Sequence, residues 1–156
     1  MRVMSYKPMI RALYDAFARG DIETILAALA DDVVWDAPGG APYSGRRFGR
    51  AGVRQYLAAV DRLVRIDEFD ADEVLEDGDY VVVLGRERAT VKESGRHFET
   101  AFAHLYKLRG GKVAEVRLFS DTNAAASAFG ESIAERKALG GPLGVTHEAF
   151  SGDPEK

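Results

Sequence analysis

The stretch HLYKLRGGKVAEVRLFSD, residues 104–121, carries several side chains suited to proton transfer within one expected β-hairpin. A glycine pair marks a tight turn, so Gly110–Gly111 is expected to join two strands. A two-residue turn would set His104 opposite Arg117 and place Asp121 on the same side. Directly opposed residues share one face of a sheet, so these three side chains are predicted to be neighbours.

A second two-residue turn, expected at Ser94–Gly95, would pair a third strand with these two and extend the same face across it. Gly85 would lie opposite His104 and leave room beside its ring, which favours a cavity. Aromatic and ionisable side chains together are typical of a partly desolvated binding wall; a solvated face is the alternative. The predicted face holds Val83, Gly85, Glu87, Thr100, Phe102, His104, Tyr106, Glu115, Arg117, Phe119 and Asp121.

Asp121 and His104 are the first candidates for catalysis. A carboxyl buried beside an aromatic ring has a raised pKa and can act as a general base or acid near neutrality. The alternative role of Asp121 is to cap a helix that begins near Thr122, because aspartate is a preferred N-cap residue. His104 is suited to donate to a substrate oxygen or to shuttle a proton, and pairing with Tyr106 or Glu87 is its alternative.

Glu87 is the third catalytic candidate, and an ion pair with Arg117 is its alternative. The aromatic side chains are candidates for contact with a substrate, although packing in the core also accounts for the tryptophan and the helix tyrosines. The predicted substrate-binding set is Trp35, Tyr14, Tyr56, Phe102, Tyr106, Arg117 and Phe119.

Hydrophobic spacing predicts the elements that position these residues. Helices are expected at 8–19, 21–32, around 53–60 and at 122–138, and strands at 33–37, 66–76, 80–92, 97–108 and 112–120. A loop rich in proline and glycine, residues 38–49, precedes the third helix. Helices followed by an antiparallel meander predict one α+β domain, residues 1–139, and a tail at 140–156.

Composition excludes several classes of function. A chain of 156 residues with 46% hydrophobic content suits one domain with a real core. A net charge of −4 with scattered basic residues argues against nucleic acid as a partner. There is no cysteine, the three histidines are far apart, and no nucleotide-binding glycine motif occurs, so neither a metal nor a cofactor is expected. No apolar run is long enough to span a bilayer and the start is unlike a signal peptide, so we expect a cytoplasmic protein with no membrane partner.

Two segments carry a resemblance to a known group. Residues 14–57, YDAFARGDIETILAALADDVVWDAPGGAPYSGRRFGRAGVRQYL, and residues 104–122, HLYKLRGGKVAEVRLFSDT, resemble the SnoaL-like polyketide cyclase and ketosteroid isomerase-like family. This family belongs to the nuclear transport factor 2-like superfamily, and the resemblance covers about residues 8–125. It implies a cone-shaped, curved antiparallel sheet wrapped around N-terminal helices, an apolar pocket, and a homodimer.

The resemblance also suggests roles for three residues. Asp121 stands where SnoaL-like cyclases and limonene-epoxide hydrolase keep a catalytic aspartate. Glu87 approximates the second acidic residue of the hydrolase. His104 falls near the aspartate that ketosteroid isomerase keeps protonated as a hydrogen-bond donor.

Other positions depart from these relatives. The general-base aspartate of the isomerase corresponds to Ala37 and its oxyanion tyrosine to Leu13. The tyrosine–asparagine pair of the hydrolase corresponds to Trp35 and Ala37. Neither specific activity transfers to this sequence.

The sequence therefore predicts a small cofactor-independent enzyme. Its expected chemistry is acid–base catalysis of the isomerase, cyclase or hydrolase type on an apolar, oxygenated small molecule. A non-catalytic ligand-binding module and a dimerisation module of the same fold are the alternatives.

Overall fold

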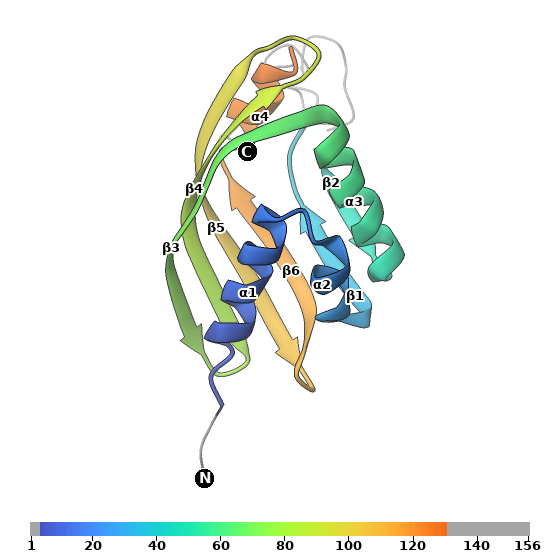
Figure 1. Ribbon diagram of the computed structural model, residues 1–156, viewed down its shortest axis with the longest axis vertical. Helices are drawn as coiled ribbons and strands as arrows, with labels where there is room; N and C mark the ends of the chain where they lie inside the picture. Colours follow the sequence, from blue (N-terminus) through green and yellow to red (C-terminus); the bar gives the residue numbers. More distant parts are fainter. Residues whose placement is uncertain (1–3, 131–156) are drawn as a thin grey trace, which may run out of the picture.

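The computed structural model describes residues 4–130 and folds into four helices and six strands within that range (Figure 1). The elements are α1 (Lys7–Ala18), α2 (Ile22–Ala27), β1 (Leu29–Ala37), β2 (Gly45–Phe48), α3 (Gly49–Leu63), β3 (Val64–Asp77), β4 (Tyr80–Val91), β5 (His97–Arg109), β6 (Lys112–Ser120) and α4 (Thr122–Ala128). The end of the predicted last helix and the predicted domain boundary at residue 139 lie outside the described residues.

The long strands confirm the predictions from alternating hydrophobicity. The second helix is shorter than predicted, because the chain turns at Ala28 and Leu29 already begins β1. Leu29 is fully buried in β1, and the predicted helix would also have buried it. Its place in the hydrophobic pattern therefore did not distinguish a helix from a strand. The loop predicted at 38–49 contains a short strand, β2, that pairs with the end of β1.

The six strands form one curved sheet in the order β2-β1-β6-β5-β4-β3. Helices α1, α2 and α3 lie on the same side of this sheet, which curves around them in a cone-shaped α+β fold (Figure 1). The expected antiparallel meander is present from β3 to β6. The sheet as a whole is mixed, because β1 pairs with β6 in parallel.

The predicted register between β5 and β6 is wrong. Arg109 does pair with Lys112 across the glycine turn, but a bulge at Ala114 shifts every later pair by one residue. His104 therefore lies opposite Leu118 instead of Arg117. A shift of one residue turns a strand over, because successive side chains point to opposite faces.

The predicted faces of β4 and β5 are correct, although their pairing differs by two residues. The connection after Val91 is longer than a two-residue turn, so Thr90 pairs with His97. A shift of two residues keeps every side chain on its face. Gly85 consequently lies opposite Phe102 instead of His104.

Gly85 is required by close packing on both sides. A Cβ at this position would lie 2.0 Å from the backbone oxygen of Asp70 and 2.4 Å from the Phe102 ring. The ring of Phe102 thus fills the space that the sequence suggested was open beside His104.

We expect Gly85→Ala to lower the free energy of unfolding by about 2 kcal/mol or more, because the backbone oxygen of Asp70 cannot move aside as a side chain can. Urea denaturation followed by circular dichroism measures this loss. Gly52→Ala in α3 is the comparison: its nearest neighbour is a side-chain carbon of Arg47 at 3.2 Å, and alanine favours a helix. Equal stability of the two variants would contradict this account of Gly85.

Candidate functional site

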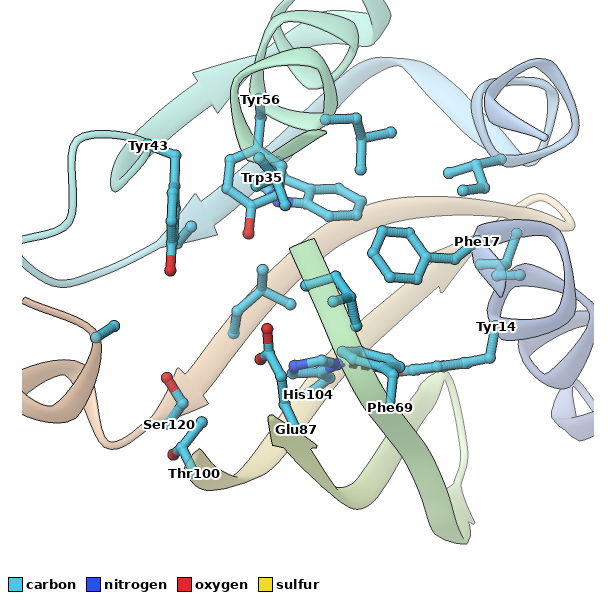
Figure 2. A pocket seen from close by; sticks show the side chains of 18 of the residues that line it. Tyr14, Phe17, Trp35, Tyr43, Tyr56, Phe69, Glu87, Thr100, His104 and Ser120 are labelled. Carbon is cyan, nitrogen blue, oxygen red and sulfur yellow. Dashed lines mark hydrogen bonds between the residues drawn. The ribbon is translucent and has the colours of Figure 1, made fainter. Parts of the chain in front are cut away.

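A cavity of about 130 Å³ lies between the helices and the concave face of the sheet (Figure 2). Its size is close to that of the roughly 150 Å³ engineered cavity that binds benzene, so it accommodates about one six-membered ring. Helix α1, helix α3, strand β1 and the strands β3 to β6 all contribute to the wall. The lining residues are Leu13, Tyr14, Phe17, Ile25, Trp35, Ala37, Pro38, Tyr43, Tyr56, Leu57, Val60, Ile66, Phe69, Glu87, Phe98, Thr100, His104, Tyr106, Leu118, Ser120 and Ala125.

Among residues 4–130, Glu87 is the only acidic side chain that lines the cavity. It points inward from β4, next to Thr100 on β5, with which it is paired in the sheet. Within residues 4–130 its carboxyl group accepts no hydrogen bond and contacts no cation. Burial alone therefore raises its pKa from 4.5 to about 7, because the charged form loses its water without compensation. Near neutral pH the group exists in both its acid and its base form.

His104 lies on the same wall and is held by a chain of hydroxyl groups. The Tyr14 hydroxyl is 2.8 Å from His104 Nδ1 and 2.7 Å from the Tyr106 hydroxyl. Burial lowers the pKa of His104 to about 3, so the imidazole is neutral at physiological pH. Burial also raises the pKa of Tyr14 and Tyr106 far above the ordinary value, which keeps both hydroxyl groups protonated.

Phe102 lies behind His104 and outside the cavity lining. Its ring stacks on the imidazole with the centroids 4.0 Å apart and an interplanar angle of 16°. The Phe69 ring stacks on Phe102 in turn, at 5.0 Å, and also lines the cavity. Phe102 was predicted to contact substrate; its position instead fixes the plane of the imidazole.

Three polar groups face the cavity from the side opposite β4 and β5. They are the indole nitrogen of Trp35 on β1 and the hydroxyl groups of Tyr43 and Tyr56 (Figure 2). The Trp35 and Tyr56 rings pack with centroids 5.5 Å apart, and Tyr43 meets Tyr56 edge to face. Burial raises the pKa of both tyrosines well above the ordinary value, so their hydroxyl groups stay protonated.

The bulge in β6 removes three predicted site residues from the cavity wall. Arg117 and Phe119 lie on the outer face of the sheet, where Arg117 pairs with Glu115 at 2.7 Å and Phe119 is 49% exposed. Asp121 is exposed and caps α4, accepting a hydrogen bond from the Ala124 backbone N–H at 3.1 Å. The capping alternative for Asp121 is therefore what the structure has, and the expected ion pair of Arg117 with Glu87 is absent.

The other predicted site residues do come together. Glu87, His104, Trp35, Tyr14, Tyr56 and Tyr106 all line the cavity. Phe17, Tyr43, Phe69 and Ser120 also line the cavity but were not among the predicted site residues. Ser120 occupies the inward position that was predicted for the residues on either side of it, Phe119 and Asp121. Allowing for one extra residue in β6 would therefore have identified Ser120 as a lining residue.

No Lys or Arg side chain lines this cavity, and no group of metal-ligating side chains occurs among the described residues. An anionic ligand would meet no compensating positive charge here, and Glu87 would repel it. The arrangement suits a small neutral molecule with polar groups at its edge. In the part of the chain that the structure describes, no helix is long and apolar enough to cross a membrane.

Comparison with known proteins gives consistent results. The profile of the SnoaL-like domain family matches residues 10–116. A nuclear transport factor 2-like protein from Burkholderia pseudomallei is 31% identical, with a TM-score of 0.72, over 80% of this chain and 98% of its own. One from Burkholderia xenovorans is 30% identical, with a TM-score of 0.72, over 78% and 92%. TerC, crystallised with polyporic acid, is 30% identical, with a TM-score of 0.66, over 78% and 95%. Proteins with curated descriptions gave no significant match.

The raised pKa of Glu87 predicts a specific dependence of stability on pH. Between pH 4.5 and pH 7 the folded protein keeps a proton that the unfolded chain releases, so stability contributed by this group falls as pH rises through that range. Glu87→Gln should therefore gain free energy of unfolding relative to wild type between pH 5 and pH 8, by on the order of 3 kcal/mol. Urea denaturation at both pH values measures the difference.

Any constant cost of burying the glutamine amide cancels in this difference. Glu115→Gln, at an exposed ion pair, is the matched control and should show no such gain. An equal effect of Glu87→Gln at both pH values would mean that the folded-state pKa is not raised.

Proposed function

Because the chain belongs to the SnoaL-like domain family, we propose that its cavity is the site of acid–base chemistry on a small neutral organic molecule, with Glu87 as the proton-transfer group. The observation that carries the proposal is a buried carboxyl group that, among the described residues, accepts no hydrogen bond and pairs with no cation. This role replaces Asp121, the residue favoured by sequence and resemblance, because the Asp121 side chain caps α4 outside the cavity.

Glu87 combines two properties of a general base. Its carboxylate is desolvated, so it is more basic than a carboxylate in water, and its pKa of about 7 leaves it substantially ionised at neutral pH. In the reaction the carboxylate takes a proton from a carbon next to a carbonyl group. The C–H electron pair moves toward the carbonyl oxygen, and return of the proton at another carbon completes an isomerisation. Attack of the same carbanion on a second carbonyl carbon within the molecule moves the π electrons of that carbonyl to its oxygen, and return of the proton to this oxygen completes a cyclisation.

His104 is suited to stabilise the negative charge that develops on oxygen. When the Tyr14 hydroxyl donates to Nδ1, the proton of the neutral imidazole resides on Nε2, which then serves as a hydrogen-bond donor. A neutral donor in a desolvated site stabilises an enolate without being deprotonated itself. Tyr14 and Tyr106 act as positioning residues, because they fix the tautomer and the ring orientation.

The composition of the wall supports a neutral, largely apolar ligand. Most lining residues are aromatic or aliphatic, and the cavity volume suits about one ring. Ligands larger than one ring would require the cavity to open beyond the conformation described.

The proton-transfer role can be tested without knowing the natural substrate. The probe is 1,2-benzisoxazole, from which a base removes the C3 proton while the N–O bond breaks, releasing 2-cyanophenolate. We expect the rate to rise with pH through about 7 and then level off, because the ionised form of Glu87 is the active one. Glu87→Gln should lower the rate about 100-fold, measured by the absorbance of the phenolate.

Two comparisons make this test decisive. Asp121→Asn keeps an N-cap residue and separates the two carboxyl candidates: a loss of rate there, with Glu87→Gln active, would overturn the assignment. A fluorescence screen with the single tryptophan supplies further ligands to test for turnover. Tight binding of ligands that are recovered unchanged, with no Glu87-dependent rate on benzisoxazole, would favour the binding-module alternative.

We also propose that the outer face of the sheet binds a second copy of the chain. Leu75, Tyr80 and Phe119 expose 51%, 44% and 49% of their surface there. Rows of paired residues continue this face through Val82–Leu105 and Leu84–Ala103. Lys107 and Arg117 alternate with Glu73 and Glu115 around these apolar side chains, so two identical faces can meet with opposite charges together.

Phe119→Asp should shift the protein from dimer to monomer, because it sets a charge in the apolar row formed by Leu84, Ala103 and Phe119. Sedimentation velocity at several concentrations measures the change. Gln55→Asp, at an exposed position of α3, is the control and should leave the mass unchanged. A wild-type protein that is monomeric at all concentrations would contradict this proposal without affecting that for Glu87.

A further inference from the structure

The indole N–H of Trp35 is a buried donor with no acceptor. Trp35 is 7% exposed, and among the described residues no acceptor lies within hydrogen-bonding distance and angle of its Nε1. The Tyr56 hydroxyl is near enough to feel the indole N–H, which slightly opposes the rise of its pKa. A buried donor left unpaired costs about 1–3 kcal/mol, so such a group calls for a partner that residues 4–130 do not supply.

The Tyr56 hydroxyl faces the cavity beside this indole. Its raised pKa keeps it protonated, and within residues 4–130 it donates no hydrogen bond to the protein. Figure 2 shows the indole nitrogen and this hydroxyl on one wall, with Glu87 and His104 on the other. Two protonated donors thus lie together on one wall of an apolar cavity.

We propose that Trp35 Nε1–H and the Tyr56 hydroxyl together bind a carbonyl oxygen of the ligand, on the wall opposite His104. This inference rests on the proposed function: the substrate then carries two oxygen atoms on different sides of a ring, one at His104 and one at this donor pair. Its chemical class is a neutral cyclic dicarbonyl compound.

A carbonyl oxygen fits this pair better than other polar groups. It has two lone pairs for two donors and no proton of its own that would need an acceptor. A carboxylate or phosphate is disfavoured because no Lys or Arg lines the cavity and Glu87 is acidic. A carbonyl at this position also acidifies the adjacent C–H groups, which is the chemistry that a general base across the cavity requires.

The test compares 1,4-cyclohexanedione with cyclohexanone, two neutral rings that differ by one carbonyl group. Trp35 is the only tryptophan, so the indole N–H gives a single cross-peak in a ¹H–¹⁵N spectrum. We expect the dione to move this proton downfield and to bind about three- to tenfold more tightly than the monoketone. In Trp35→Phe and in Tyr56→Phe this affinity ratio should fall towards one.

Tyr6→Phe, outside the cavity lining, is the control and should keep the wild-type ratio. An unchanged ratio in both cavity variants, or failure of the dione to bind up to its solubility limit, would overturn the inference. Glu87→Gln should retain the downfield shift. The donor pair and the proton-transfer role can therefore fail separately, since one is read from the indole resonance and the other from the benzisoxazole rate.

Discussion

The extra residue in β6 decides which side chains reach the cavity. With Ala114 bulged out of the ladder, Val116, Leu118 and Ser120 turn toward the helices while Arg117 and Phe119 turn outward. Had the ladder been regular, a guanidinium group would lie beside His104 and within reach of Glu87. A cation there would lower the pKa of the carboxyl group and remove its capacity to act as a base near neutrality. The bulge thus keeps the cavity free of positive charge.

The cavity wall contains polar groups that are hydrogen-bonded to one another and polar groups that are not. Tyr14, Tyr106 and His104 bond to one another, so this part of the wall is rigid and has a defined proton arrangement. Among the described residues, the Glu87 carboxyl group and the indole N–H of Trp35 have no hydrogen bond that meets the distance and angle for one. Unpaired groups in a desolvated space interact strongly with whatever enters, because no competing bond must first be broken. Stability is lost at these positions and binding specificity is gained.

Much of this could be predicted from the sequence. The alternation of apolar residues located β3 to β6, and the inward faces of β4 and β5 followed from it, which brought Glu87 and His104 together. The error arose in β6, because a bulge leaves the hydrophobic pattern of a half-buried strand almost unchanged: Val116 and Leu118 read as apolar on either face. The role of Asp121 depended on that register. The parallel pairing of β1 with β6 has no local signal, since it joins segments about 80 residues apart.

That parallel pairing also governs how the chain can fold. The backbone of Ala28 and the strand that follows it bond to residues near Val113, so β1 has no central partner until β6 exists. Closing so long a loop is entropically unfavourable and slows the search for the native pairing. During synthesis β1, which carries Trp35, can therefore pair only with β2 and pack only on the nearby helices until β6 has been made. The wall of the cavity that carries Trp35 is thus built from strands that lie far apart in the sequence.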